Sequence, residues 1–211
     1  GEMNRAVYGA TLSSVLFYQN LVLQLEKWGF DVNPYELCTF NKVENGKSIT
    51  IQFHVDDLKL SHVDEAVLEK YVNLLNKRFR TKYQELTVNR TDVHDYLGLT
   101  LDYTHQKQRY VKLTMYDFLE DILKEVDEKG DMNGECVTPA AENLFTVVET
   151  SEKLNAKKAD YFHRIVARLL FASKRARPDL QVAVAYLCTR VKSPNEADYD
   201  KLRRVIKYIR R

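Results

Sequence analysis

The sequence is poor in cysteine and contains no long apolar run. Its three cysteines, Cys38, Cys136 and Cys188, are widely spaced and form no Cys-x-x-Cys motif. This pattern excludes a disulfide framework and the common zinc-site spacings. No stretch of about 18 apolar residues occurs, and the N-terminal GEMNRAVYGA lacks the basic, apolar and small-residue succession of a signal peptide. We therefore expect a soluble, intracellular protein with no membrane partner.

The charges are distributed unevenly along the chain. Residues 1–163 contain 19 Lys and Arg against 26 Asp and Glu, a net charge of −7. Residues 164–211 contain 13 against 4, a net charge of +9. Such a basic segment is either a polyanion-binding face or a set of solvated helix faces, and charge alone leaves both readings open.

Hydrophobic periodicity predicts a mixed architecture. Helical spacing predicts helices over residues 13–28 and 64–79. Period-two alternation predicts one hairpin within 48–62 and a second formed by a strand over 97–103 and a return strand near 110–113. The remaining helices are expected at 114–130, capped by Thr114, at 156–176, at 179–191 and from a capping box at Ser193–Glu196. This order predicts an α+β domain followed by an all-α one.

The first hairpin, SITIQFHVDDLKLSH, contains two adjacent aspartates, Asp56 and Asp57. Its alternation requires a loop of two residues, because the apolar face of one strand must continue on the other. That condition fits a loop at Val55-Asp56 and equally one at Asp56-Asp57. In both registers Asp56 lies on the polar face, opposite the core.

Local chemistry leaves the role of the aspartate pair open. Two carboxylates about 5 Å apart repel by less than ~1 kcal/mol in water, so an exposed turn tolerates them without a cation. Aspartate is also an ordinary turn residue. Alternatively, such a pair would hold Mg²⁺, which takes few protein carboxylates and keeps positions for phosphate oxygens and water.

Five segments, taken in order, resemble the reverse transcriptase of copia-type retrotransposons. They are AVYGATLSSVLFY, FHVDDL, DYLGLTLDY, RARPDLQVAVAYL and PNEADYDKLRRVIKYIR. The second is similar to the YVDDL turn of that family. The resemblance implies a partial polymerase palm over residues 1–111, followed by a helical thumb and connecting region over 112–211 that leads toward an RNase H domain.

The resemblance also implies roles for individual residues. Asp56 and Asp57 would be catalytic aspartates and ligands of two Mg²⁺ ions in nucleotidyl transfer, in a turn centred on Val55-Asp56. Tyr8, Gly9 and Val55 would lie near the incoming nucleotide, although Tyr8 and Gly9 read equally as a helix-entry loop. The hairpin at 97–113 is where an element that grips the primer is expected.

The implied partners are those of an RNA-directed DNA polymerase. They are an RNA template with its DNA primer, a deoxynucleoside triphosphate, and the upstream fingers and downstream RNase H of the same polyprotein. The location implied is a cytoplasmic virus-like particle, or the nucleus. The basic edges of the last helix would track phosphates without reading bases. Their residues are Lys201, Arg203, Arg204, Lys207, Arg210 and Arg211.

Two departures from the family pattern qualify this interpretation. Residues 1–6, GEMNRA, contain no strand with the third catalytic carboxylate. We therefore expect a fragment that does not polymerise alone, and two alternatives stay open: a non-catalytic nucleic-acid-binding remnant, or a subunit that completes a polymerase on another chain. In addition, His54 replaces the usual Tyr or Phe before the turn. It would pack neutrally, pair with Asp57 or contact the primer end.

Overall fold

The computed structural model describes residues 11–81 and 85–211, so Tyr8 and Gly9 lie outside the described residues. The chain divides into two compact units, residues 1–90 and 91–211. The division after residue 90 rests on compactness and does not test where the palm ends. The palm boundary at residue 111 therefore stays a prediction.

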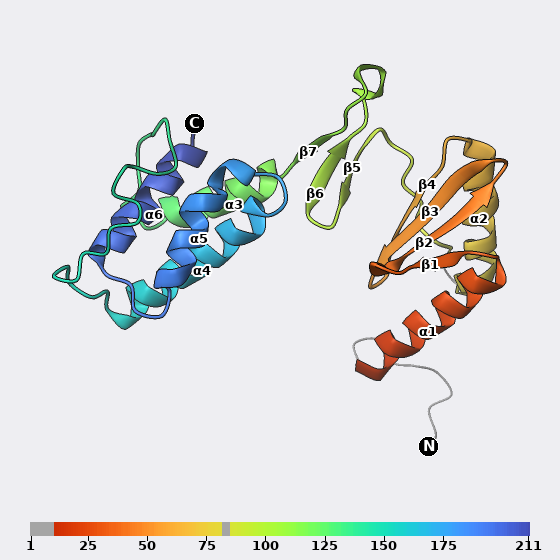
Figure 1. The fold of residues 1–211 in the computed structure, drawn as a ribbon, viewed down its shortest axis with the longest axis horizontal. Helices are drawn as coiled ribbons and strands as arrows, with labels where there is room; N and C mark the ends of the chain where they lie inside the picture. The colour runs from red at the N-terminus through yellow and green to blue at the C-terminus, as the bar shows by residue number, and fades with distance from the viewer. Residues whose placement is uncertain (1–10, 82–84) are drawn as a thin grey trace. The chain divides into compact units, whose positions relative to one another are not determined.

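The first unit is an antiparallel sheet flanked by two helices (Figure 1). The strand order is β1-β2-β3-β4. Both helices agree with their predicted spans to within two residues, whereas β1 and β2 were not predicted. The elements are α1 (Thr11–Lys27), β1 (Asp31–Asn33), β2 (Glu36–Glu44), β3 (Lys47–His54), β4 (Asp57–Ser61) and α2 (Glu65–Phe79).

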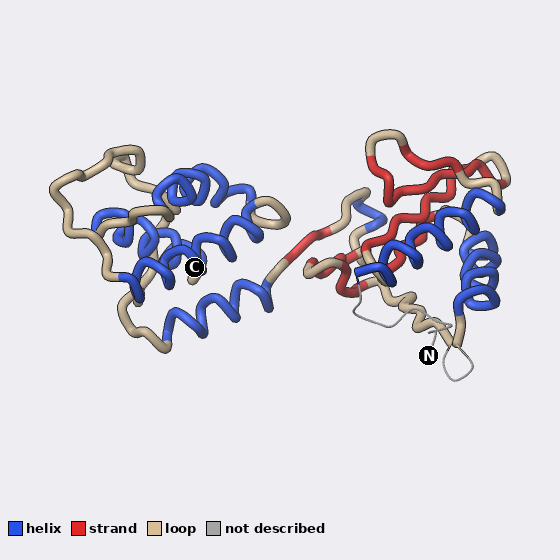
Figure 2. Tube along the Cα trace, turned by 90° about the horizontal axis from the view of Figure 1, so that it is seen from below, coloured by secondary structure: helices blue, strands red, loops and turns tan. Residues whose placement is uncertain are grey.

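The core of this unit lies between the sheet and the two helices, which cover the same side of it (Figure 2). Alternate residues of β3 point into this core, so Ile49, Ile51 and Phe53 are buried while Gln52 and His54 are exposed on the other face. Leu21 and Leu25 of α1 and Tyr71 of α2 complete the buried cluster. The predicted polar face of the hairpin is confirmed.

The second unit begins with a small antiparallel sheet in the order β5-β6-β7, built from Val93–Tyr96, Leu99–Asp102 and Lys112–Thr114. The β6-β7 pairing confirms the predicted hairpin, although its first strand is Leu99–Asp102 rather than 97–103, and β5 was not predicted. A two-residue turn at Leu97-Gly98, with φ of 53° and 75°, separates β5 from β6. A loop of two residues preserves the alternation, so the pattern does not reveal the break.

Four helices form the rest of this unit, as predicted. They pack around one buried cluster that includes Ile122, Phe162, Leu169 and Ile206. The whole chain is therefore α+β, as expected of a partial palm followed by a helical region. The elements are the 3₁₀ turns η1 (Gln106–Gln108) and η2 (Pro178–Leu180) and the helices α3 (Tyr116–Asp127), α4 (Ala156–Ser173), α5 (Gln181–Arg190) and α6 (Glu196–Ile209).

Two predicted helix starts need correction. The capping box of α6 is formed by Asn195 and Asp198, not by Ser193 and Glu196. The reason is that Pro194 O accepts a hydrogen bond from Leu154 N, which keeps Pro194 outside the helix. Similarly, Thr114 lies in β7 rather than capping α3, which begins at Tyr116.

Residues 128–155, here called the strap, connect α3 to α4 without a helix or strand of their own. The sequence pattern likewise predicted no helix or strand between the helices at 114–130 and 156–176. The strap runs along α6 (Figure 1). Among the described residues, no helix has the length and apolar character needed to span a membrane.

Candidate active site

The turn between β3 and β4 is centred on Val55-Asp56. His54 is the cross-strand partner of Asp57, and Phe53 is the partner of Leu58. Of the two registers that the sequence allows, the structure therefore has the one implied by the family resemblance. The buried Phe53 ring packs against Tyr18 and Phe40, with centroids 5.7 Å and 6.0 Å away, and so fixes the hairpin on the core.

The turn itself presents its side chains to solvent. Asp56 and Asp57 are both exposed, and Val55 is 64% exposed. The two carboxylates follow one another at the end of a rigid hairpin whose opposite face is buried.

The backbone at Val55 is strained. Its φ is 56°, a left-handed conformation that is a genuine outlier for a β-branched residue. Such conformations cost on the order of 1–3 kcal/mol and cluster at functional sites. The strain is therefore an independent indication that this turn has a role beyond reversing the chain.

The aspartate pair fits part of a magnesium site. Carboxylate oxygens are the donors that Mg²⁺ prefers, and both groups are accessible. Within residues 11–81 and 85–211, however, no group of three His, Cys, Asp or Glu side chains is placed to hold a metal ion.

His54 is exposed rather than packed into the core. It lies directly across the strand pair from Asp57, on the open face of the sheet. This position favours the predicted pairing with Asp57 or a contact to a bound ligand over the predicted neutral packing.

Sequence comparison places this turn in a family. The family described as reverse transcriptase (RNA-dependent DNA polymerase) matches residues 1–142, about two thirds of the chain. The chain belongs to the reverse transcriptase family. The resemblance inferred from the motifs is thereby confirmed.

Two plant proteins are similar to this reverse transcriptase chain. It is 25% identical over 211 residues to the "Retrovirus-related Pol polyprotein from transposon RE2" of Arabidopsis thaliana, covering 99% of the chain and 13% of that protein. It is 28% identical over 158 residues to an uncharacterized mitochondrial protein of the same plant, covering 74% of the chain and 59% of that protein. The chain thus spans less than two thirds of either relative. No solved structure matches it.

A polar cluster at the far end of β3 was not predicted. The Lys42 ammonium donates to Trp28 O at 2.7 Å and to the Tyr71 hydroxyl at 2.9 Å, and that hydroxyl donates to Glu44 at 2.5 Å. Hydrogen bonds from Lys70 and Tyr71 lower the pKa of Glu44 to about 2. The cluster ties β2 to α2, a structural role at the end of the sheet opposite the aspartates.

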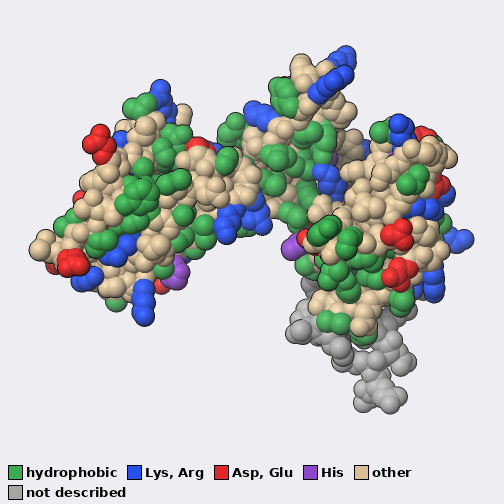
Figure 3. Space-filling view, in the orientation of Figure 1, with side chains coloured by type: hydrophobic (Ala, Val, Ile, Leu, Met, Phe, Trp, Pro, Cys, Tyr) green, Lys and Arg blue, Asp and Glu red, His purple; other side chains and the backbone are tan. Residues whose placement is uncertain are grey.

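The six cations predicted to track phosphates lie on α6 or just after it, but most are engaged within the chain. Arg203 pairs with Asp200 and lies 3.6 Å from Asp131, and Arg210 pairs with Asp127. The pairing with Arg210 lowers the pKa of Asp127. On the face shown in Figure 3, Lys and Arg side chains of this unit are scattered among acidic and hydrophobic ones. Phosphate binding by this helix therefore stays a prediction.

The remaining three cations of α6 contact the strap. Lys201 donates to Thr146 O at 2.6 Å, and Arg204 donates to the Thr138 hydroxyl at 2.8 Å. Lys207 lies against Gly134. These partners are 55 or more residues away in sequence, so no local pattern could have revealed them. Arg211 is exposed.

Proposed function

We propose that this chain carries the catalytic turn of an RNA-directed DNA polymerase of the copia type. The observation that supports this most directly is the two-residue turn centred on Val55-Asp56. It presents two exposed carboxylates on a hairpin with a buried inner face and a strained backbone.

In this proposal Asp56 and Asp57 bind Mg²⁺. When bound, the metal ions would lower the pKa of the primer 3′-hydroxyl and neutralise charge on the transferring phosphoryl group. The residues of this chain contribute the orientation: Phe53 anchors the hairpin in the core, so the carboxylates are held by a rigid element. Rigid placement matters because small displacements of reacting groups lower the rate strongly.

The remaining parts of the site would come from other segments of a longer polyprotein. The relative from transposon RE2 is several times longer than this chain, which covers 13% of it. A third carboxylate and the fingers would precede the described residues, and an RNase H domain would follow. Tyr8, Gly9 and Val55 would lie near the deoxynucleoside triphosphate, and the helical unit would contact the primer-template duplex.

Complementation tests this proposal. Primer extension on poly(rA)/oligo(dT) with Mg²⁺ would be measured for the chain alone and for the chain mixed with the preceding segment of the RE2 polyprotein. We expect no extension by either part and extension by the mixture. Extension by the chain alone would show that the site is complete without further ligands. No extension by a mixture that forms a stable complex would contradict the catalytic assignment.

A further inference from the structure

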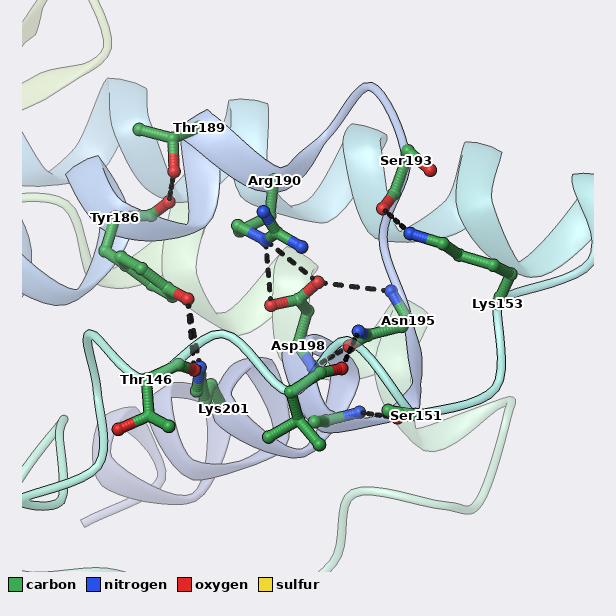
Figure 4. A network of polar contacts seen from close by, with 12 residues as sticks. Thr146, Ser151, Lys153, Tyr186, Thr189, Arg190, Ser193, Asn195, Asp198 and Lys201 are labelled. Carbon is green, nitrogen blue, oxygen red and sulfur yellow. Dashed lines mark hydrogen bonds and ion pairs between the residues drawn. The ribbon is translucent and has the colours of Figure 1, made fainter.

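The strap covers the outward face of α6 along its length. At the start of the helix, Ala197 N donates to the Ser151 hydroxyl at 3.1 Å, and the Asn195 side chain donates to Val148 O at 2.9 Å (Figure 4). Toward the end of the helix, Cys136 N donates to Lys207 O at 3.1 Å. The strap and α6 therefore run in opposite directions, in contact from one end to the other.

Three cations lie beneath the strap at regular spacing. Lys201, Arg204 and Lys207 follow one another every three residues in α6. From Lys201 to Lys207 the distance along the helix axis is about 9 Å. One nucleic-acid strand presents about three phosphates over such a length. The strap meets Lys201 and Arg204 with a carbonyl and a hydroxyl oxygen, Thr146 O and Thr138 Oγ1. A phosphate oxygen would replace either neutral acceptor with an anionic one, and a hydrogen bond between two ions of opposite charge is stronger.

The covering part of the strap is weakly anchored. Between Met132, which is 0% exposed, and Leu154, Leu144 provides the one buried side chain. A cavity of about 290 Å³ lies between residues 139–148 and α6, lined by Ala140, Ala141 and Arg204 among others. Segments with few buried apolar contacts open locally at low free-energy cost.

From these observations we propose that the strap is a displaceable cover that competes with nucleic-acid phosphates for Lys201, Arg204 and Lys207. The inference rests on the proposed function, since it concerns the duplex contact of the helical unit. Opening the strap exposes the row of cations, and a bound duplex holds it open. The apparent affinity for duplex is then lowered by the fraction of molecules in which the strap is closed.

Cys136 reports on the strap directly. It lies in the strap, and its backbone N–H donates a hydrogen bond to Lys207 O in α6. In the full chain with Cys38→Ala and Cys188→Ala, Cys136 is the only thiol. It is half-buried while the strap is closed, so its alkylation rate should rise when the strap opens. We expect a saturating primer-template duplex at low salt to raise that rate at least about tenfold.

A matched pair of strap variants extends the test. Leu144→Ala removes the buried anchor, so it should raise the alkylation rate without duplex at least about tenfold and should tighten duplex binding. Val147→Ala, in the same segment but 46% exposed, should change neither. Duplex binding would be followed by fluorescence anisotropy in the same samples.

The outcomes separate the two proposals. Duplex binding with an unchanged or slower alkylation of Cys136 would overturn the cover and leave the polymerase assignment intact. Failure of the duplex to bind would overturn both the cover and the assignment of the helical unit as a duplex contact. The primer-extension assay tests the aspartates independently of either result.

Discussion

Two turns of the same sheet, one at each end of β3, differ in their chemistry. Both contain two residues, and the first residue of each has nearly the same φ, 51° at Asn45 and 56° at Val55. Asn45-Gly46 is the sequence that best fits a tight hairpin, because asparagine and glycine tolerate positive φ. In the Val55-Asp56 turn the β-branched Val55 has the same positive φ, which is unfavourable for such a residue.

We interpret this difference as one between a turn that serves folding and a turn that we propose serves catalysis. The Asn45-Gly46 turn lies beside the Lys42, Glu44 and Tyr71 cluster and serves only to join two strands. The Val55-Asp56 turn carries the carboxylates that we assign to metal binding, and its strain is maintained by the buried Phe53 next to it. Three experiments test this comparison.

The largest expected effect is on catalysis. Asp56→Asn keeps the shape of the turn but removes a charge that we assign to metal binding, so primer extension by the complemented protein should fall about 10³-fold, or about 4 kcal/mol. The matched control is Asp31→Asn, an exposed aspartate on the edge strand β1 of the same sheet. It should leave extension unchanged, and an equal loss in both variants would argue against a specific role for Asp56.

The second expected effect is on stability. It is tested by giving each turn the residue type found at the first position of the other. Val55→Asn should raise the free energy of unfolding of the first unit by about 1 kcal/mol, because it relieves the strain. Asn45→Val should lower it by about 1–2 kcal/mol for the converse reason. Both positions are exposed, so packing changes little.

Trp28 is the only tryptophan and lies in the first unit, so its fluorescence in a urea titration follows that unit. If Val55→Asn proved neutral or destabilising, the turn would not be strained. The comparison between the two turns would then fail.

The smallest effect is the pH dependence contributed by Glu44. Its pKa is about 2 in the folded chain, below the ordinary value of about 4.3, because Lys70 and Tyr71 bond to the carboxylate. The stabilisation is therefore present above about pH 4 and is lost as the pH falls toward 2. In Trp28-monitored unfolding, the stability difference between the wild type and Glu44→Gln should shrink over that interval. A difference that is constant with pH would contradict the assigned hydrogen bonds.

The parts of the fold that could be predicted are those with strong periodicity. The helices at 13–28 and 64–79 have apolar stripes, and their boundaries were nearly correct. Strand β2 was missed because its inward face carries Lys42 and Glu44, which interrupt the alternation of apolar and polar residues. Those two side chains are stabilised there by Tyr71, from a helix that follows much later in the chain.

Turns of two residues could not be located from the alternation of apolar and polar residues. They leave the alternation in phase, so the sequence could not choose between the two registers at Asp56 and could not reveal the Leu97-Gly98 turn. The structure resolved both. The helix that carries most of the predicted cations could be predicted from its periodicity. Their contacts with the strap could not, because those contacts depend on tertiary packing.

The central claim is that the Val55-Asp56 turn binds a divalent metal and the Asn45-Gly46 turn does not. Addition of Mn²⁺ to the isotope-labelled chain tests it, since the paramagnetic ion broadens the backbone amide resonances of nearby residues. The two turns are separated by the eight residues of β3, about 26 Å, so the effects are distinguishable. We predict selective broadening at residues 54–58, abolished in the double variant Asp56→Asn, Asp57→Asn. Broadening that is absent there, or equal at residues 45 and 46, would contradict the claim.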